Sequence, residues 1–168
     1  MPRVLINHYR AVFEAAYRTD PFHGFRGNLT SVTDAEWRVR PADWSREVFG
    51  GQPELSIRDL AFHVGGALVM YTDRAFGEAK LEWGDIAGPS GDDMETVLAW
   101  LDNAHAAVAA GLAALRDDSE LAETRQTPWR TPLPRAQLIG LMPNHLVYHS
   151  GEVNRQRALI RGSSGWDR

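Results

Sequence analysis

The spacing of apolar residues between positions 92 and 116 is the strongest constraint on the fold. These residues recur at intervals of four and three, the pattern that forms the buried seam between helices packed in a bundle. The positions that follow this spacing are Met94, Leu98, Leu101, His105, Val108, Leu112 and Leu115. The segment therefore predicts a long helix with one face buried against other helices.

Three further segments have helical periodicity, which gives expected helices at about 4–18, 56–76, 92–116 and 134–160. Ser56 is a preferred N-cap residue, and Asp59 three residues later completes an approximate capping box at the start of the second helix. We find no internal repeat and no convincing pair of strands. The sequence therefore predicts one all-α domain over residues 1–168, folded as a four-helix bundle.

A long connection, residues 19–55, separates the first two helices and is punctuated by glycine and proline. Within it, Thr33-Asp34-Ala35-Glu36 predicts one capped helical turn. Trp37 and Trp44 are expected to pack the connection against the end of the bundle. A connection of this length often shapes the rim of a pocket.

Composition excludes several classes of site and partner. The chain has no cysteine, so any metal must be bound through nitrogen and oxygen. A net charge of −4 argues against nucleic acid as a partner. No signal peptide and no membrane-spanning apolar run stands out, which favours a cytoplasmic protein without a membrane partner. Lys80 is the only lysine among 18 basic residues, and this arginine bias indicates a GC-rich bacterial genome.

A polar stripe interrupts the apolar run of the last expected helix. His145, His149, Glu152 and Gln156 are three or four residues apart and so share one helix face. An unpaired imidazole is costly to bury. The stripe therefore predicts half of a metal site that needs a third ligand from another helix. We expect Glu152 to orient a ligand or form an ion pair, ahead of a role as general base.

His63 is the best third ligand, because it lies on the inward stripe of a helix that can face the last one. A core histidine that donates to a backbone carbonyl is an equal alternative. His105 and His8 also lie on apolar stripes and are interpreted as buried histidines rather than ligands. His23 is expected at the surface.

Two small-scale features bear on the geometry of this site. Gly65-Gly66 follows His63 and either leaves space beside its imidazole or permits close helix packing. Pro143 lies inside the last helix, where it removes a backbone hydrogen bond and is expected to kink the helix just before His145.

Two segments resemble the DinB/YfiT-like superfamily. Ser56-Ile-Arg-Asp-Leu-Ala-Phe-His63 is similar to the capped segment that opens the second helix in that superfamily and supplies its first metal histidine. His145-Leu-Val-Tyr-His149-Ser-Gly-Glu152 is similar to the His-x-x-x-His-x-Gly-[Gln/Glu] signature of its last helix. The order of helices and the Trp129 loop also match, so the resemblance spans nearly the whole chain.

This resemblance implies an up-down-down-up bundle, usually a homodimer, with a divalent metal held by His63, His145 and His149. The linker near residues 77–91 would then have to cross the bundle. Zinc or nickel is favoured, with iron or manganese as alternatives, since nitrogen-rich ligation does not choose among them.

Three neutral imidazoles leave coordination positions open for water or substrate, as in catalytic sites. Our first hypothesis is a metal-dependent enzyme that activates a small-molecule thiol, such as mycothiol in an S-transferase-like reaction, or water in a hydrolase-like one. Glu152 would orient a ligand or move a proton, and Trp44, Trp129 and Tyr148 would line the pocket. The alternative is a non-catalytic, metal-binding dimeric helical bundle.

Overall fold

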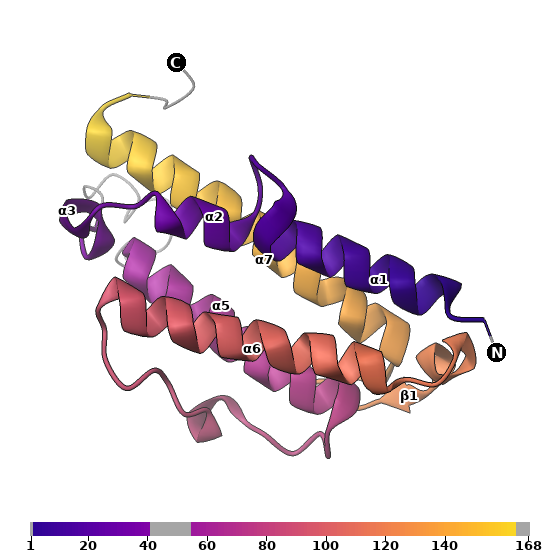
Figure 1. Cartoon of the computed structure of the whole chain (residues 1–168). Helices are drawn as coiled ribbons and strands as arrows, with labels where there is room; N and C mark the ends of the chain where they lie inside the picture. The colour runs from indigo at the N-terminus through magenta and orange to yellow at the C-terminus, as the bar shows by residue number, and fades with distance from the viewer. Residues whose placement is uncertain (1, 41–54, 164–168) are drawn as a thin grey trace.

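The computed structural model describes residues 2–40 and 55–163 and is mostly helical (Figure 1). Its long helices are α1 (Val4–Glu14), α5 (Ile57–Phe76), α6 (Met94–Ala114) and α7 (Arg135–Arg161). The shorter elements are the π-helical turn η1 (Ala15–Thr19), α2 (Phe25–Thr30), α3 (Asp34–Trp37), the 3₁₀ turns η2 (Trp83–Asp85) and η3 (Asp118–Ala122), β1 (Thr124–Arg125) and β2 (Leu133–Pro134). The expectation of an all-α chain is confirmed in this general form.

The predicted helix positions agree with the structure to within two residues when η1 is counted as the end of the first helix. At the start of α5, the Ser56 hydroxyl accepts a hydrogen bond from the backbone N–H of Asp59, and the Asp59 carboxylate accepts one from the N–H of Ser56, each at 3.1 Å. This reciprocal pair is the predicted capping box. The last helix continues through Pro143 as a single helix.

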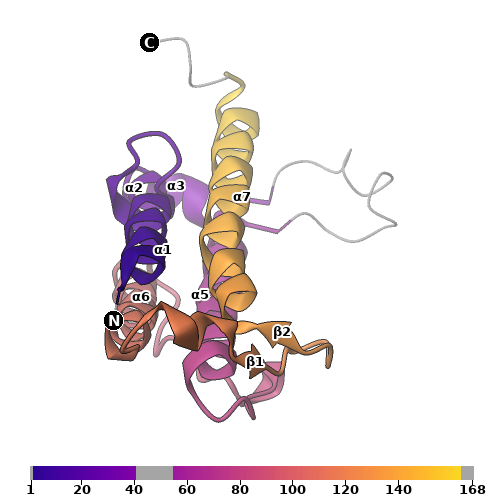
Figure 2. The same ribbon diagram turned by 90° about the vertical axis from the view of Figure 1, so that its right-hand side faces the viewer.

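The expectation of no paired strands was wrong at one place. β1 and β2 form an antiparallel pair, with Thr124 opposite Pro134 and Arg125 opposite Leu133. The pair lies at the end of the bundle where α7 begins (Figure 2). Two residues per strand are too few to show the alternating pattern from which a strand is predicted.

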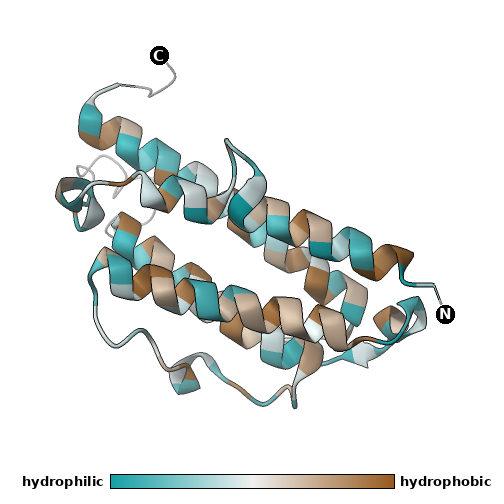
Figure 3. Cartoon of the chain, viewed as in Figure 1, coloured by the Kyte–Doolittle hydropathy of each residue, from teal (hydrophilic) through white to brown (hydrophobic). Residues whose placement is uncertain are grey.

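The core lies where α5 packs against both α6 and α7, while α1 packs along α7 (Figures 1 and 2). The long helices carry mixed hydrophilic and hydrophobic residues, as amphipathic helices do (Figure 3). Fully buried apolar side chains of the three central helices include Leu60, Val64, Leu68, Leu101, Val108, Leu112, Leu138 and Leu146. The predicted seam of α6 is therefore confirmed at its central positions.

The buried face of α1 differs from the prediction. The apolar spacing of residues 4–18 predicts a buried face with Leu5 and Val12 at its centre and with Phe13 and Tyr17 widening it. Phe13 and Tyr17 are fully buried as expected, whereas Leu5 and Val12 are exposed. The aromatic side of the helix removes more apolar surface from water than the aliphatic side, so it faces the core. His8 lies on the same exposed side of the helix as Leu5 and Val12.

By length and composition alone, α6 could cross a membrane. The expectation that no apolar segment reaches this length did not anticipate it. One such helix is weak evidence, because the core helix of a soluble protein passes the same test. Here α6 packs along α5 and fully buries Val97 and Leu101.

The connection between α1 and α5 contains more structure than expected. The predicted turn is α3, and the additional helix α2 packs on α7. Trp37 is buried, and its indole N–H donates to the backbone carbonyl of Asp92 at 2.8 Å. The predicted packing of Trp37 is thus confirmed, while Trp44 lies outside the described residues.

The linker between α5 and α6 returns along the outside of these helices, from the end of one to the start of the other (Figure 1). Its first part is held by the end of α5. The buried Arg74 guanidinium donates to the carbonyl of Leu81 at 2.6 Å, and the Asp73 carboxylate accepts from the backbone N–H of Lys80 at 2.8 Å. The linker therefore has a defined path over the bundle.

Asp102 joins α6 to the segment after α1. Its carboxylate accepts hydrogen bonds from the Tyr17 hydroxyl at 2.9 Å, from Arg18 at 2.8 Å and from Arg26 at 2.8 Å. Partial burial raises the pKa of Asp102, but hydrogen bonds from these two arginines and Tyr17 outweigh it and lower the pKa to about 2.

We predict that Asp102→Asn destabilises the fold by about 1–2 kcal/mol, since charge-assisted hydrogen bonds weaken while partial exposure limits the loss. A lowered carboxyl pKa contributes stability above its unfolded value that is lost as pH falls towards about 2. Denaturant unfolding should therefore show a shallower loss of stability below pH 4 or so in the variant. Glu95→Gln, on the exposed side of α6, is the control. Equal acid sensitivity of wild type and Asp102→Asn would contradict this role.

Candidate metal site

Three histidines from two helices meet at one point between α5 and α7. The Nε2 atom of His145 lies 3.1 Å from Nε2 of His63 and 3.0 Å from Nε2 of His149. One ligand atom of each residue lies within 4.8 Å of the others. Because His145 and His149 are one helical turn apart on α7, both imidazoles face the neighbouring α5, which carries His63.

Glu152 fixes the ring of His149. Its carboxylate Oε2 lies 2.6 Å from Nδ1 of His149, one turn along α7. Partial burial raises the pKa of Glu152, but hydrogen bonding to His149 outweighs this effect and lowers it, so the group is an anion that can only accept. Nδ1 of His149 therefore carries a hydrogen, and its bond to Glu152 orients the ring with Nε2 towards His145.

This arrangement fits a cation. Three Nε2 atoms converge, and adjacent lone pairs repel unless a proton or a metal ion lies between them. Nitrogen ligands of tetrahedral zinc, at about 2.0–2.1 Å from the ion, lie roughly 3.3–3.4 Å apart, close to the spacing here. Within the described ranges, Nδ1 of His145 is buried without a hydrogen-bond partner, so the ring gains little from the protein alone. The cluster could hold a divalent metal ion.

The electrostatics of the site also favour neutral ligands. Burial, together with the neighbouring His149 and His63, lowers the pKa of His145 to about 4. Burial likewise lowers the pKa of His63. Both rings are therefore neutral near pH 7, which is the form that coordinates a metal.

The other end of the polar stripe has a structural contact. The Gln156 side chain is buried, and its amide donates to the carbonyl of Leu55 at 2.6 Å. This bond ties α7 to the residue just before the N-cap of α5. It holds together the two helices that carry the histidines.

A cavity of about 570 Å³ opens beside His63. We call it the aromatic cavity; its walls include Phe62, His63, Gly66, Trp83, Ile86 and Trp100. Trp129 and Tyr148, expected to line a pocket here, are exposed and do not belong to these walls. Sequence reasoning missed Trp83 and Trp100, although Gly65-Gly66 was a signal of close packing beside His63.

The two glycines accommodate these two tryptophans. A Cβ atom on Gly65 would lie 2.0 Å from the Trp100 ring, and one on Gly66 would lie 3.2 Å from the Trp83 ring. Close packing is therefore the reason for Gly65. At Gly66 the missing side chain lets Trp83 approach His63, with ring centroids 5.5 Å apart.

The remaining histidines lie outside the cluster. His105 is buried with its ring stacked between Phe13 and Tyr17, at centroid distances of 5.0 and 4.2 Å, which confirms its interpretation as a buried histidine. Burial lowers the pKa of His105 although Glu14, 2.8 Å from its Nε2, opposes this. His8 was expected to be buried and is exposed, whereas His23 is exposed as predicted.

Comparison with known proteins gives one match. The family model described as the DinB superfamily matches residues 23–153, a range that contains all three clustered histidines and Glu152. No curated protein and no solved structure matches the chain.

We predict that His145 titrates near pH 4 in the metal-free protein, because its pKa is lowered to about 4 by burial. The unfolded chain takes up this proton near pH 6.5, so the folded state loses stability as pH falls between the two values. NMR of the histidine ring resonances, with His145→Gln for assignment, measures the midpoint. A midpoint near 6.5 would show that the ring is not desolvated.

Proposed function

The chain belongs to the DinB superfamily, and on that basis we propose that it is a metal-dependent enzyme whose divalent metal ion is bound by His63, His145 and His149. The observation that supports this most is the convergence of three Nε2 atoms: that of His145 lies 3.1 Å from that of His63 and 3.0 Å from that of His149. Zinc or nickel is the first choice and iron or manganese the alternative, since imidazole donors suit all four.

We propose that the site activates a small-molecule thiol, such as mycothiol, or water. A divalent ion bound there would supply Lewis acidity that lowers the pKa of a coordinated thiol or water. The chain contains no cysteine, so a thiol that reacts at the site would have to come from a second substrate. S-transferase-like chemistry on the thiol and hydrolase-like chemistry on water are the two forms of this proposal.

The residues around the histidines have distinct tasks in this proposal. Glu152 holds the His149 ring through Nδ1 and keeps its Nε2 lone pair aimed at the cluster centre. Because the carboxylate is half-buried and ionised, it can also accept a proton from a group bound beside His149. The aromatic cavity gives a substrate access on the His63 side.

The alternative is a non-catalytic bundle in which the metal only holds the helices together. A closed structural site needs a fourth protein ligand. Within the described residues the cluster contains three histidines, and a cavity adjoins one of them. This combination favours the enzyme.

Membership in the DinB superfamily also supports a homodimeric assembly and a particular order of the four long helices. We propose the up-down-down-up order of the four long helices, because the linker of residues 77–93 returns along the bundle between α5 and α6 (Figure 1). We further propose a bacterial, cytoplasmic homodimer with a small-molecule substrate and with neither nucleic acid nor membrane as partner. These points rest on the resemblance and on the acidic composition.

Elemental analysis of the purified protein tests the metal site. We predict roughly one divalent ion per chain in the wild type and its loss in His145→Ala, since the central ligand is removed. Glu152→Gln should keep the three ligands but weaken metal affinity by about 10–100-fold, because it no longer accepts the His149 proton as an anion. His23→Ala, at an exposed histidine, is the control. A folded wild type that binds no divalent metal would refute the proposal.

Assays of the metal-loaded protein separate the two reactions. Consumption of a small thiol with an electrophile, lost in His145→Ala, would support the transferase form. Ester or amide hydrolysis without added thiol, lost in the same variant, would support the hydrolase form. A metal-loaded protein inactive in both assays over a broad substrate panel would favour the non-catalytic alternative.

A further inference from the structure

The aromatic cavity has walls from three parts of the chain. Phe62 and Gly66 belong to α5, Trp100 to α6, and Trp83 to the linker between these helices. The Phe62 and Trp100 rings lie 6.1 Å apart between centroids, and Trp83 lies against His63 on the other side. A molecule in the cavity would therefore contact aromatic surface and reach the metal-site histidine His63.

These walls are fixed by hydrogen bonds outside the cavity. The Trp100 indole N–H donates to the linker carbonyl of Ala87 at 3.2 Å, which ties the linker to α6. The linker is held at its other end by Trp37, whose indole bonds the carbonyl of Asp92. The cavity is thus formed before a ligand enters, as small-molecule sites usually are.

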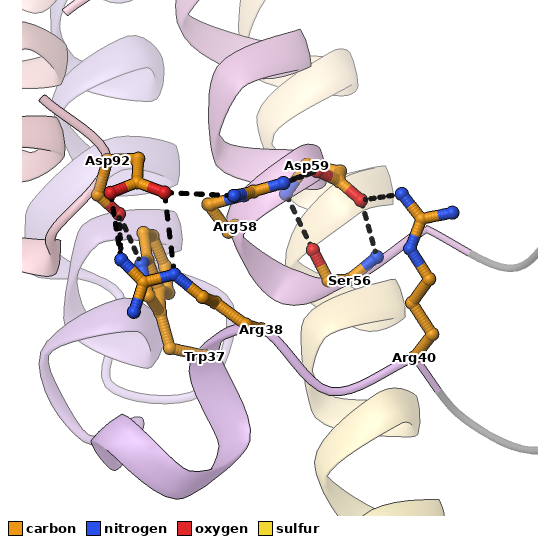
Figure 4. A network of polar contacts seen from close by, with 7 residues as sticks. All are labelled: Trp37, Arg38, Arg40, Ser56, Arg58, Asp59 and Asp92. Carbon is orange, nitrogen blue, oxygen red and sulfur yellow. Dashed lines mark hydrogen bonds and ion pairs between the residues drawn. The ribbon is translucent and has the colours of Figure 1, made fainter.

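Among the described residues, the charged ones that line the cavity are Arg58, Asp59 and Asp92, and Arg58 is paired with both aspartates (Figure 4). The Arg58 guanidinium lies 3.0 Å from the carboxylates of both Asp59 and Asp92. Arg40 lies 2.9 Å from Asp59, and Arg38 lies 2.8 Å from Asp92. Each of these described charges at the rim has an opposite charge as its partner.

This pairing decides what the cavity can bind. A charged ligand would lose hydration on entering apolar walls and would find its potential counter-charge already occupied. An uncharged ring loses little hydration and gains contact with Trp83 and Trp100.

We propose that the aromatic cavity binds an uncharged, ring-containing part of the substrate against Trp83, with its reactive atom directed to the metal-site side at His63. The reaction of this substrate rests on the proposed metal-dependent function. Binding of its ring depends only on residues of α5, α6 and the linker. The substrate class is therefore a neutral aromatic or alicyclic molecule, and an anionic acid is expected to bind more weakly.

A matched pair of ligands tests this on the full chain without metal. Benzyl alcohol and benzoate have the same ring and differ in charge. Titrations followed by NMR of the tryptophan indole N–H signals, with Trp83→Phe and Trp100→Phe for assignment, give both dissociation constants. We expect benzyl alcohol to bind at least fivefold more tightly than benzoate and to shift the Trp83 and Trp100 signals. Benzoate binding as tightly as benzyl alcohol, or shifts confined to other tryptophans, would overturn the proposal.

Variants locate the site. Trp83→Ala should weaken benzyl alcohol binding by three- to tenfold, since one aromatic wall is lost. Trp129→Ala is the matched control, because both side chains are 49% exposed and Trp129 is outside the cavity. Gly66→Ala should also weaken binding by displacing Trp83, whereas Gly84→Ala, where a new Cβ meets nothing within 4 Å, should not. Equal effects of Trp83→Ala and Trp129→Ala would overturn the assignment.

The metal state separates this inference from the proposed function. If elemental analysis finds no metal but benzyl alcohol binds the chelator-treated protein as expected, the cavity is retained and the metal-dependent reaction fails. If metal binds at the histidines but the neutral ligand shows no preference, the substrate class fails alone.

Discussion

The packing of α5 against α7 is the contact on which the rest of the site depends. It brings His63 to the pair formed by His145 and His149, and it buries all three rings enough to keep two of them neutral. The same contact is reinforced at its far end by Gln156, which bonds the residue before α5. A shift of one helix along the other would separate the nitrogen atoms and leave buried, unpaired imidazoles, which are costly.

The linker between α5 and α6 forms one wall of the aromatic cavity beside the histidines. It is anchored by Arg74 at the end of α5 and by Trp37 and Arg58 at its other end. These bonds place Trp83 beside His63 and so join the metal-site histidines to an aromatic cavity. In the proposed function the helices supply the metal ligands, and the linker supplies the surface that selects the substrate.

Much of this could be predicted from sequence where the signal is periodic or local. The four-three spacing of α6, the capping box of Ser56 and the spacing of His145 and His149 depend on neighbours along one helix. The buried face of the first helix was predicted only in part. Phe13 and Tyr17 are buried as expected, but Leu5 and Val12 are exposed, because the packed core decides which side of the helix is covered. The aromatic cavity was missed because Trp83 reaches His63 through the path of the linker, which no local pattern specifies.

X-ray absorption spectroscopy of the zinc-loaded protein tests the central claim most directly, because it counts imidazole ligands around the ion. The arrangement of His63, His145 and His149 predicts three imidazole nitrogens at about 2.0–2.1 Å and at least one further oxygen ligand. A spectrum with fewer than three imidazoles, or one unchanged in His63→Ala, would contradict a metal site shared between α5 and α7.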